Sequence, residues 1–167
     1  MIGAGAASMP KAMTRETADA EGPATLPEGF VPGGASGFLD LVGPVYVRQA
    51  DGAFGFHAEE KHANLIGVVH GGMLMSLADR ALGVAAMRAA DGANCVTIEL
   101  GMQFVGAGQI GTWIEARPFV VRRTGSLVFL RGEVVSGGDV LASASGVWKI
   151  LRRRPSEPVP GAAADPS

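Results

Sequence analysis

Several residue types are scarce in this chain, and each scarcity excludes a class of protein. The single cysteine among 167 residues excludes an internal disulfide framework and fits a reducing cytoplasm. Cys95 has no CxxC partner, so the usual spacing of a zinc site is missing. The formal net charge of −2 supplies no basic field for nucleic acid.

Long apolar runs are also missing, because every such run is broken by glycine or charge well before the roughly 20 residues of a membrane span. The N-terminus has no positively charged start before an apolar run and is therefore not interpreted as a signal peptide. We expect a cytoplasmic protein that binds neither nucleic acid nor membrane.

Apolar residues, by contrast, are plentiful: they make up 47% of the chain, enough to build the core of one domain. The two ends differ from the middle. Residues 1–28 and 152–167 are rich in alanine, proline and glycine, and they cannot bury enough apolar surface to offset the entropy of ordering. We predict a disordered leader over 1–28, one domain over 29–151 and a disordered tail over 152–167.

Periodicity within the middle predicts an α+β fold. A short helix or turn is expected near 37–42, a hairpin from 44–48 and 53–59, and a long helix from Gly72 to Ala90. Four strands follow, over 95–105, 111–122, 126–135 and 140–151, separated by glycine-rich turns. This order implies a meander of antiparallel strands wrapped around one apolar helix.

Alternation in the first of these four segments assigns its faces. Val96, Ile98 and Leu100 would share one face, whereas Thr97 and Glu99 would share the other.

The long helix holds one carboxylate, Asp79, in a sequence that is apolar around most of its circumference. That pattern predicts a helix enclosed by other structure. Because an unpaired buried carboxylate costs several kcal/mol, Asp79 is either paired, with Arg80 or a strand residue, or protonated, or kept for chemistry.

The residues before the helix favour chemistry. His70 is followed by Gly71 and Gly72, which permit a tight entry and a close approach of substrate to the main chain. Unpaired N–H groups at a helix N-terminus stabilise developing negative charge. The segment therefore predicts an oxyanion site.

The pattern Asn64, Gly67, His70-Gly71-Gly72, Leu77-Ala78-Asp79 and Gly83 resembles the hotdog-fold acyl-CoA thioesterases of the phenylacetate-degradation (PaaI-like) family over about residues 38–151. The resemblance implies an antiparallel sheet around one long central helix. It also implies that the Gly71 N–H polarises the thioester carbonyl, and that Asp79 is the nucleophile or the general base for water. No cofactor or metal is implied.

Spacing makes an oligomer part of this mechanism. Gly71 and Asp79 are eight residues apart, or roughly 12 Å along one helix. One carbonyl cannot contact both groups of the same chain, since each contact needs about 3 Å. Antiparallel helices related by a two-fold axis would bring Asp79 of one protomer beside Gly71 of its partner. Members of the resembled family pair their sheets edge to edge into dimers, and many stack dimers into tetramers; we expect a homodimer, assembled further into a homotetramer.

Three further residues match family positions near the thioester, and each has a plainer alternative. Asn64 would orient substrate or water, or else form a turn before Gly67. His70 would act as acid or base, although we favour a role in shaping the turn. Thr97 would help to hold the attacking water, or is an ordinary strand residue.

Substrate binding is predicted at two places. The acyl pocket would be lined by Gly72, Met75 and Leu82, together with strand faces. By resemblance, coenzyme A would meet a strand–turn–strand junction, where arginine suits phosphate. That junction comprises Arg122, Arg123, Gly125 and Ser126.

A metal site from His57, Glu59, Glu60 and His62 is rejected in favour of solvated side chains on a loop. The predicted function is hydrolysis of an acyl-CoA or aryl-acyl-CoA thioester. A hotdog-fold hydratase or dehydratase would need a histidine and an acid over the α- and β-carbons. A non-catalytic acyl-CoA binding protein would have no use for a carboxylate at position 79.

Overall fold

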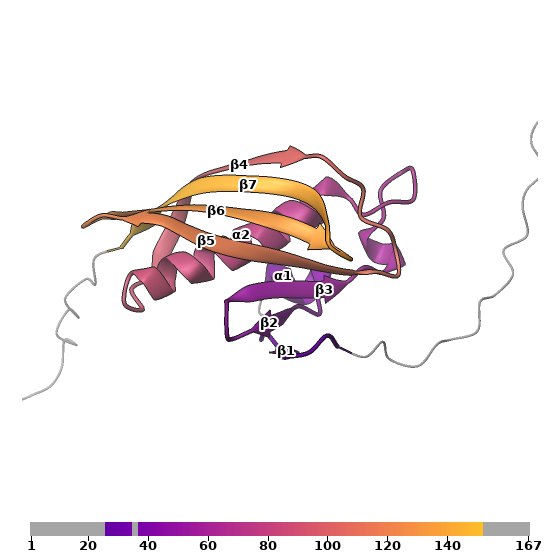
Figure 1. Cartoon of the computed structure of the whole chain (residues 1–167), viewed down its shortest axis with the longest axis horizontal. Coiled ribbons are helices and arrows are strands. Elements are labelled where there is room, and N and C mark those ends of the chain that lie inside the picture. Colours follow the sequence, from indigo (N-terminus) through magenta and orange to yellow (C-terminus); the bar gives the residue numbers. More distant parts are fainter. Residues whose placement is uncertain (1–25, 35–36, 152–167) are drawn as a thin grey trace, which may run out of the picture.

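A seven-stranded antiparallel sheet curves around one long helix in the computed structural model (Figure 1). The structure describes residues 26–34 and 37–151. The predicted tail, 152–167, and all but the last three residues of the predicted leader, 1–28, lie outside the described residues. The elements in chain order are β1 (Phe30–Pro32), α1 (Phe38–Val42), β2 (Tyr46–Arg48), β3 (Ala53–His57), the 3-10 turn η1 (Glu60–His62), α2 (Gly71–Ala89), β4 (Cys95–Phe104), β5 (Trp113–Arg123), β6 (Leu127–Ser136) and β7 (Asp139–Ile150).

The short helix, the hairpin, the long helix and the four C-terminal strands are confirmed, with ends shifted by a few residues. Strand β1 was not predicted, because a strand of three residues is too short to show a periodic pattern. None of the helices in the described part of the chain combines the length and the apolar character needed to cross a membrane.

The predicted meander is wrong at β4. The sheet order is β1-β2-β3-β5-β6-β7-β4, so β4 pairs with β7 and lies at one edge (Figure 1). Helix α2 crosses the concave face of the sheet, and the chain that leaves its C-terminus continues into β4 at that edge. The next strand, β5, returns across the sheet to pair with β3, and β6 and β7 fill the space between β5 and β4.

One stripe of α2 forms the core with the sheet. Its buried residues are Met73, Leu74, Leu77, Ala78, Ala81, Leu82 and Ala86. They pack on inward side chains of the C-terminal strands, among them Ile114, Val128, Leu130 and Trp148. Full burial of one such large side chain stabilises the fold by about 1.5–3 kcal/mol.

The opposite face of α2 is open, which corrects the prediction of an enclosed helix. Met75 is 38% exposed, and Asp79 is also exposed. A single sheet can cover only one side of a helix, so the apolar residues on the other side remain uncovered within one chain.

A β-bulge reverses the predicted faces at the start of β4. Thr97 pairs with Trp148, whereas the neighbouring Val147 pairs with Glu99, so Ile98 is an extra residue in the ladder. Because Trp148 is buried against the helix, Thr97 lies on the inner face. Val96 and Ile98 lie outside and are 46% and 60% exposed. The prediction that they share a face with Leu100 is therefore wrong.

Candidate active site

Asp79 and Thr97 form a hydrogen-bonded pair between the middle of α2 and the edge strand β4. The Thr97 hydroxyl donates to a carboxylate oxygen of Asp79 at 2.8 Å. The bulge at Ile98 makes this contact possible, because unbroken alternation with Leu100 would turn Thr97 away from the helix. Both residues are exposed.

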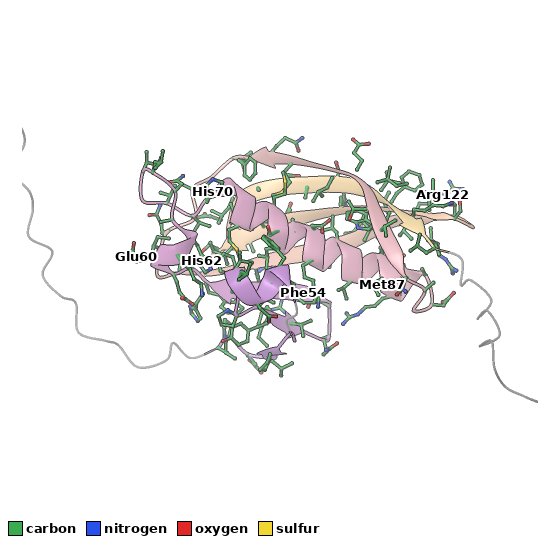
Figure 2. All side chains as sticks on the ribbon, turned by 180° about the vertical axis from the view of Figure 1, so that it is seen from behind. Phe54, Glu60, His62, His70, Met87 and Arg122 are labelled. Carbon is green, nitrogen blue, oxygen red and sulfur yellow. The ribbon has the colours of Figure 1, made fainter. Side chains whose placement is uncertain are left out.

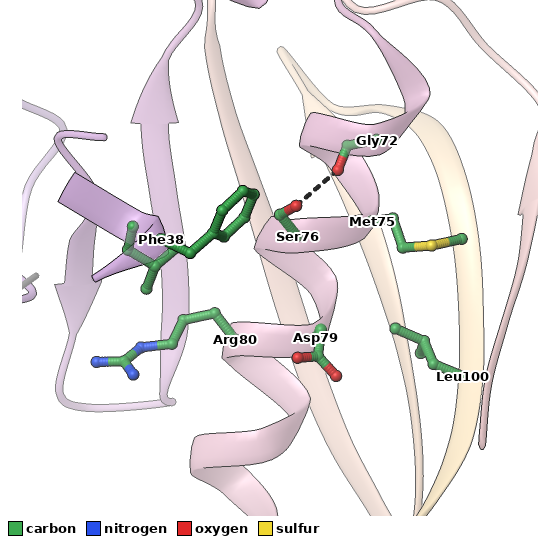
Figure 3. Close-up of a pocket in the computed structure, with 8 residues that line it drawn as sticks. Phe38, Gly72, Met75, Ser76, Asp79, Arg80 and Leu100 are labelled. Carbon is green, nitrogen blue, oxygen red and sulfur yellow. Dashed lines mark hydrogen bonds between the residues drawn. The ribbon is translucent and has the colours of Figure 1, made fainter. Parts of the chain in front are cut away.

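Arg80 points away from Asp79, so the predicted alternative of a pair between these neighbours is wrong (Figure 3). Its guanidinium lies over the ring of Phe54, 5.4 Å from the centroid. Successive residues on a helix leave the axis about 100° apart, so Asp79 and Arg80 diverge. The other predicted partner, a strand residue, is the one observed.

His70 caps the N-terminus of α2. Its Nδ1 accepts a hydrogen bond from the Gly72 N–H at 2.8 Å, and its carbonyl accepts from Met73 and Leu74. The ring is thus bonded to backbone at the turn, the arrangement favoured from the sequence. Among the described residues, no acceptor is bonded to the N–H of Gly71.

Gly71 begins the helix under the ring of Phe104. A Cβ added at Gly71 would lie 3.3 Å from that ring, closer than most side-chain contacts, so even alanine would press on the ring. Gly71 is half-buried.

A cleft of about 550 Å³ lies along the open face of α2, between α1 and β4 (Figure 3). It is lined by Phe38, Leu39, Gly72, Met75, Ser76, Asp79, Arg80 and Leu100. The predicted Gly72 and Met75 are here, next to Asp79. Leu82 is not, because it is on the sheet-facing stripe and only 1% exposed. Its assignment to the acyl pocket is corrected.

Sequence reasoning missed the other lining residues. Ser76 follows Gly72 by one helical turn and donates its hydroxyl to the Gly72 carbonyl at 2.7 Å; the i, i+4 spacing from Gly72 to Arg80 could have placed it on this face. Phe38 and Leu39 belong to α1, which is distant in sequence. No local pattern could have revealed them.

Comparison with known proteins identifies the family. The family model described as "Thioesterase superfamily" matches residues 66–143, a span that includes Gly71, Asp79 and Thr97. A Pseudomonas aeruginosa protein named "Putative esterase PA0474" is 36% identical over 130 residues, which are 75% of this chain and 97% of that protein. This chain belongs to the thioesterase superfamily.

Solved structures of the superfamily extend the comparison. The phenylacetic acid degradation protein PaaI of Thermus thermophilus, solved as a point mutant, is 28% identical with a TM-score of 0.56, covering 59% of this chain and 84% of that one. The BH2602 protein of Bacillus halodurans, solved with CoA, is 26% identical with a TM-score of 0.56, covering 60% and 67%. The hotdog fold and the PaaI-like resemblance predicted from the sequence are confirmed.

In this thioesterase-superfamily chain, Asn64 is held by its own loop. Its side-chain oxygen accepts from the N–H groups of Ile66 at 3.0 Å and Val68 at 3.3 Å, and Gly67 adopts a positive φ of 83°. This is the turn that the sequence offered as the plainer alternative. Asn64 thereby shapes the loop that leads to His70.

The residues weighed for a metal site divide into two groups. Glu59 and Glu60 are exposed, as expected. His62 is 4% exposed and makes hydrogen bonds to the Glu59 N–H and the Val42 carbonyl, so it is a structural residue rather than a solvated one. His57 packs edge-on against Trp113. Within the described residues, no group of three potential ligands is close enough to hold a metal ion.

The predicted coenzyme A junction lies at the far end of the helix. In Figure 2, Arg122 is beyond the Met87 end of α2, opposite His70. Arg123 pairs with Asp91 at 2.9 Å, whereas Arg122 pairs across the sheet with Phe129 on the outer face. Gly125 and Ser126 form the connecting turn, where Thr124 accepts the Ser126 N–H. Within one chain these residues do not reach the Asp79 cleft.

Cys95 lies near the Asp79–Thr97 pair, in a smaller hollow beside the cleft. Burial raises the pKa of its thiol above the ordinary value. The thiol therefore stays protonated near neutral pH and is a poor nucleophile.

Proposed function

We propose that this protein is an acyl-CoA thioesterase, which hydrolyses an acyl- or aryl-acyl-CoA to the free acid and CoA. Membership of the thioesterase superfamily supports hydrolase activity, and the CoA in the Bacillus halodurans relative supports the substrate class. The observation that carries the proposal is the 2.8 Å hydrogen bond from Thr97 to Asp79. It orients a carboxylate at a largely apolar cleft.

In this mechanism Asp79 is the general base. Thr97 donates its only proton to one carboxylate oxygen, and its own oxygen still has acceptor capacity. A water bound to the other carboxylate oxygen of Asp79 and to the Thr97 hydroxyl would be oriented for attack. Its oxygen bonds to the thioester carbon while its proton passes to Asp79. The C–S bond then breaks, and the departing sulfur takes the proton to give CoA.

The oxyanion donor comes from a partner protomer. Gly71 and Asp79 are roughly 12 Å apart along α2, so the Gly71 N–H of the same chain cannot reach the carbonyl attacked beside Asp79. A two-fold axis relating antiparallel α2 helices would place the partner's Gly71 there, with two equal sites per homodimer. The N–H of Gly71, which has no acceptor among the described residues, and the open face of α2 support this arrangement.

Mixing two inactive variants tests the shared site. Asp79→Asn removes the base, and Gly71→Pro removes the N–H donor. Proline suits the first helical position, and the extended His70 before it, at φ −63° and ψ 134°, is compatible with a following proline. Heterodimers should recover one of two sites, about half of the wild-type activity.

Gly71→Ala is the matched control, because it adds a Cβ under Phe104 but keeps the N–H. It should remain far more active than Gly71→Pro. Purified, folded heterodimers without any recovered activity would contradict the shared site.

A further inference from the structure

Arg80 is the feature of the cleft that the hydrolytic mechanism does not use. Asp79 and Arg80 are the two charged residues among the eight that line the cleft, and they point apart (Figure 3). Hydrolysis of a thioester needs the carboxylate, but it gives no role to a cation at the other side of the acyl space.

Arg80 lacks an anionic partner within the described residues, where its Nε is buried without a hydrogen-bond acceptor. Other arginines are satisfied: Arg48 binds Asp51 and Glu115, and Arg123 binds Asp91. Guanidinium is always charged, and leaving its Nε–H buried and unpaired is costly. In the part of the chain that the structure describes, a cation–π contact with the ring of Phe54 offsets part of this cost.

We propose that Arg80 selects acyl-CoA substrates whose acyl group ends in a carboxylate, an inference that rests on the proposed thioesterase activity. A carboxylate matches the planar fork of guanidinium with two parallel hydrogen bonds. Asp79 repels such a group, and Arg80 attracts it. The terminal carboxylate is therefore directed to the Arg80 side, and the thioester is left beside Asp79.

The apolar lining of the cleft suits the same class of acyl group. Phe38, Leu39, Met75 and Leu100 line the cleft; Phe38 lies on the Arg80 side of Asp79, and Met75 and Leu100 lie on the other side (Figure 3). Such an apolar wall is compatible with the methylene chain of a dicarboxylic acid. The recognition contact is remote from the reacting carbon and is the same before and during the reaction. It should therefore act mainly through KM.

Three matched substrate pairs test the inference: glutaryl- against pentanoyl-CoA, adipyl- against hexanoyl-CoA and suberyl- against octanoyl-CoA. For at least one pair, kcat/KM of the wild-type protein should be about tenfold or more higher for the carboxylated member, the scale of a charge-assisted hydrogen bond. Arg80→Met should abolish that preference, so that kcat/KM becomes about equal for the two members of the pair, mainly through a higher KM for the carboxylated member. Arg80→Lys should keep part of the preference for the carboxylated ester, because lysine keeps the positive charge but lacks the planar guanidinium that binds a carboxylate with two hydrogen bonds.

Arg88→Met is the matched control, since Arg88 lies on the same helix, binds Gln49 and is not part of the cleft. It should keep the wild-type preference.

A wild-type protein that hydrolyses the uncharged esters as well as the carboxylated ones overturns the inference and leaves the proposed function standing. Equal preference for 6-hydroxyhexanoyl- and adipyl-CoA overturns the assignment to a carboxylate. A protein that hydrolyses no CoA ester overturns both. If Arg80→Met fails to fold, the ratio of kcat/KM between carboxylated and uncharged esters, measured on the wild-type protein, still tests the inference.

Discussion

The hydrogen bond from Thr97 restrains the carboxylate of Asp79 at an exposed position of the helix. In the mechanism that we propose, this restraint matters because a general base must keep within about 3 Å of the water that it activates.

Thr97→Val tests this at the scale of one residue. Valine keeps the shape of threonine and removes the hydroxyl. We expect kcat to fall by about tenfold or more with KM little changed, because the hydroxyl acts on the attacking water and not on substrate binding. Steady-state kinetics on the best acyl-CoA ester check this. Thr97→Ser, which restores the hydroxyl, should recover most of the loss; an active Thr97→Val protein would remove Thr97 from the mechanism.

Asp79 itself should be indispensable. We expect Asp79→Ala and Asp79→Asn to leave a folded oligomer and to lower turnover by about 10² or more, the scale of a lost base or nucleophile. Circular dichroism of both variants checks that they are folded, and turnover measurements check the loss of activity. Near-wild-type turnover of Asp79→Asn would show that the base is elsewhere.

The two possible roles of Asp79 differ in the oxygen that they transfer. In a single turnover in H₂¹⁸O, a general base delivers a solvent oxygen, so the released acid should carry one ¹⁸O. A nucleophile forms an anhydride, and when water opens that anhydride at the Asp79 carbonyl the released acid keeps an oxygen from the Asp79 carboxylate in the first turnover. Mass spectrometry of the acid tests this: an unlabelled acid would reject the general-base mechanism proposed above, whereas a labelled acid would exclude opening of an anhydride at the Asp79 carbonyl.

At the scale of whole elements, the sequence was informative wherever the signal was local. Glycine-rich turns and alternation predicted the four C-terminal strands, and the apolar pattern predicted α2. The place of β4 in the sheet was not predictable in this way, because the pairs that β4 makes with β7 join residues 38 to 55 positions apart, from Phe104 with Ala142 to Cys95 with Ile150. Such pairing leaves no pattern in the sequence of either strand. The bulge at Ile98 was equally hidden, since a valine–threonine–isoleucine run is as good a regular strand as an irregular one.

In the candidate site, too, local features could be predicted from the sequence and long-range features could not. The motif around Gly71 and Asp79 could be recognised because residue types and spacing are fixed along one helix. The contribution of α1 and the orientation of Arg80 could not, because they depend on tertiary packing and on the choice of one rotamer.

The hairpin of β2 and β3 contains an acid-sensitive contact. Asp51 accepts hydrogen bonds from Arg48 and from the Ala53 N–H, and the Arg48 hydrogen bond lowers the pKa of its carboxyl. A lowered folded pKa contributes stability above the unfolded value, about 3.9, which is lost as the pH falls through the folded value. Asp51→Asn should therefore cost less than about 1 kcal/mol of unfolding free energy at pH 7, since the pair is surface-exposed.

Urea titrations at pH 7 and pH 3 check this: the difference between wild-type and Asp51→Asn should shrink at the lower pH. A difference that grows on acidification would show that the Arg48 contact does not favour the charged form of Asp51.

The hairpin of β5 and β6 provides the test of coenzyme A binding. Arg123 pairs across the ladder with the buried Val128 and lies on the helix side, whereas Arg122 lies on the outer face. We therefore expect Arg123→Ala to raise KM several-fold with kcat little changed, and Arg122→Ala to serve as the unchanged control. The effect should vanish with a truncated pantetheine thioester, which lacks the phosphates. Equal losses on both esters would place the phosphates elsewhere.

At the scale of the whole molecule, apolar side chains are exposed both on the open face of α2, such as Met75, and on the outer face of the edge strand β4, such as Ile98. The proposed homodimer would cover the open face of α2, and a homotetramer would add a second interface. Sedimentation equilibrium should show a dimer or a larger even assembly at micromolar concentration. A monomer would leave the Gly71 and Asp79 sites of different chains unable to meet.

The place of β4 at the edge of the sheet also determines when the molecule can be completed during synthesis. Strand β4 is made before β5, yet the strand that it pairs with, β7, is the last of the described strands to leave the ribosome. Until then β4 has an unpaired backbone next to the helix that it must cover, a condition that favours aggregation. Thr97 meets Asp79 in its final setting only when this last strand has been added.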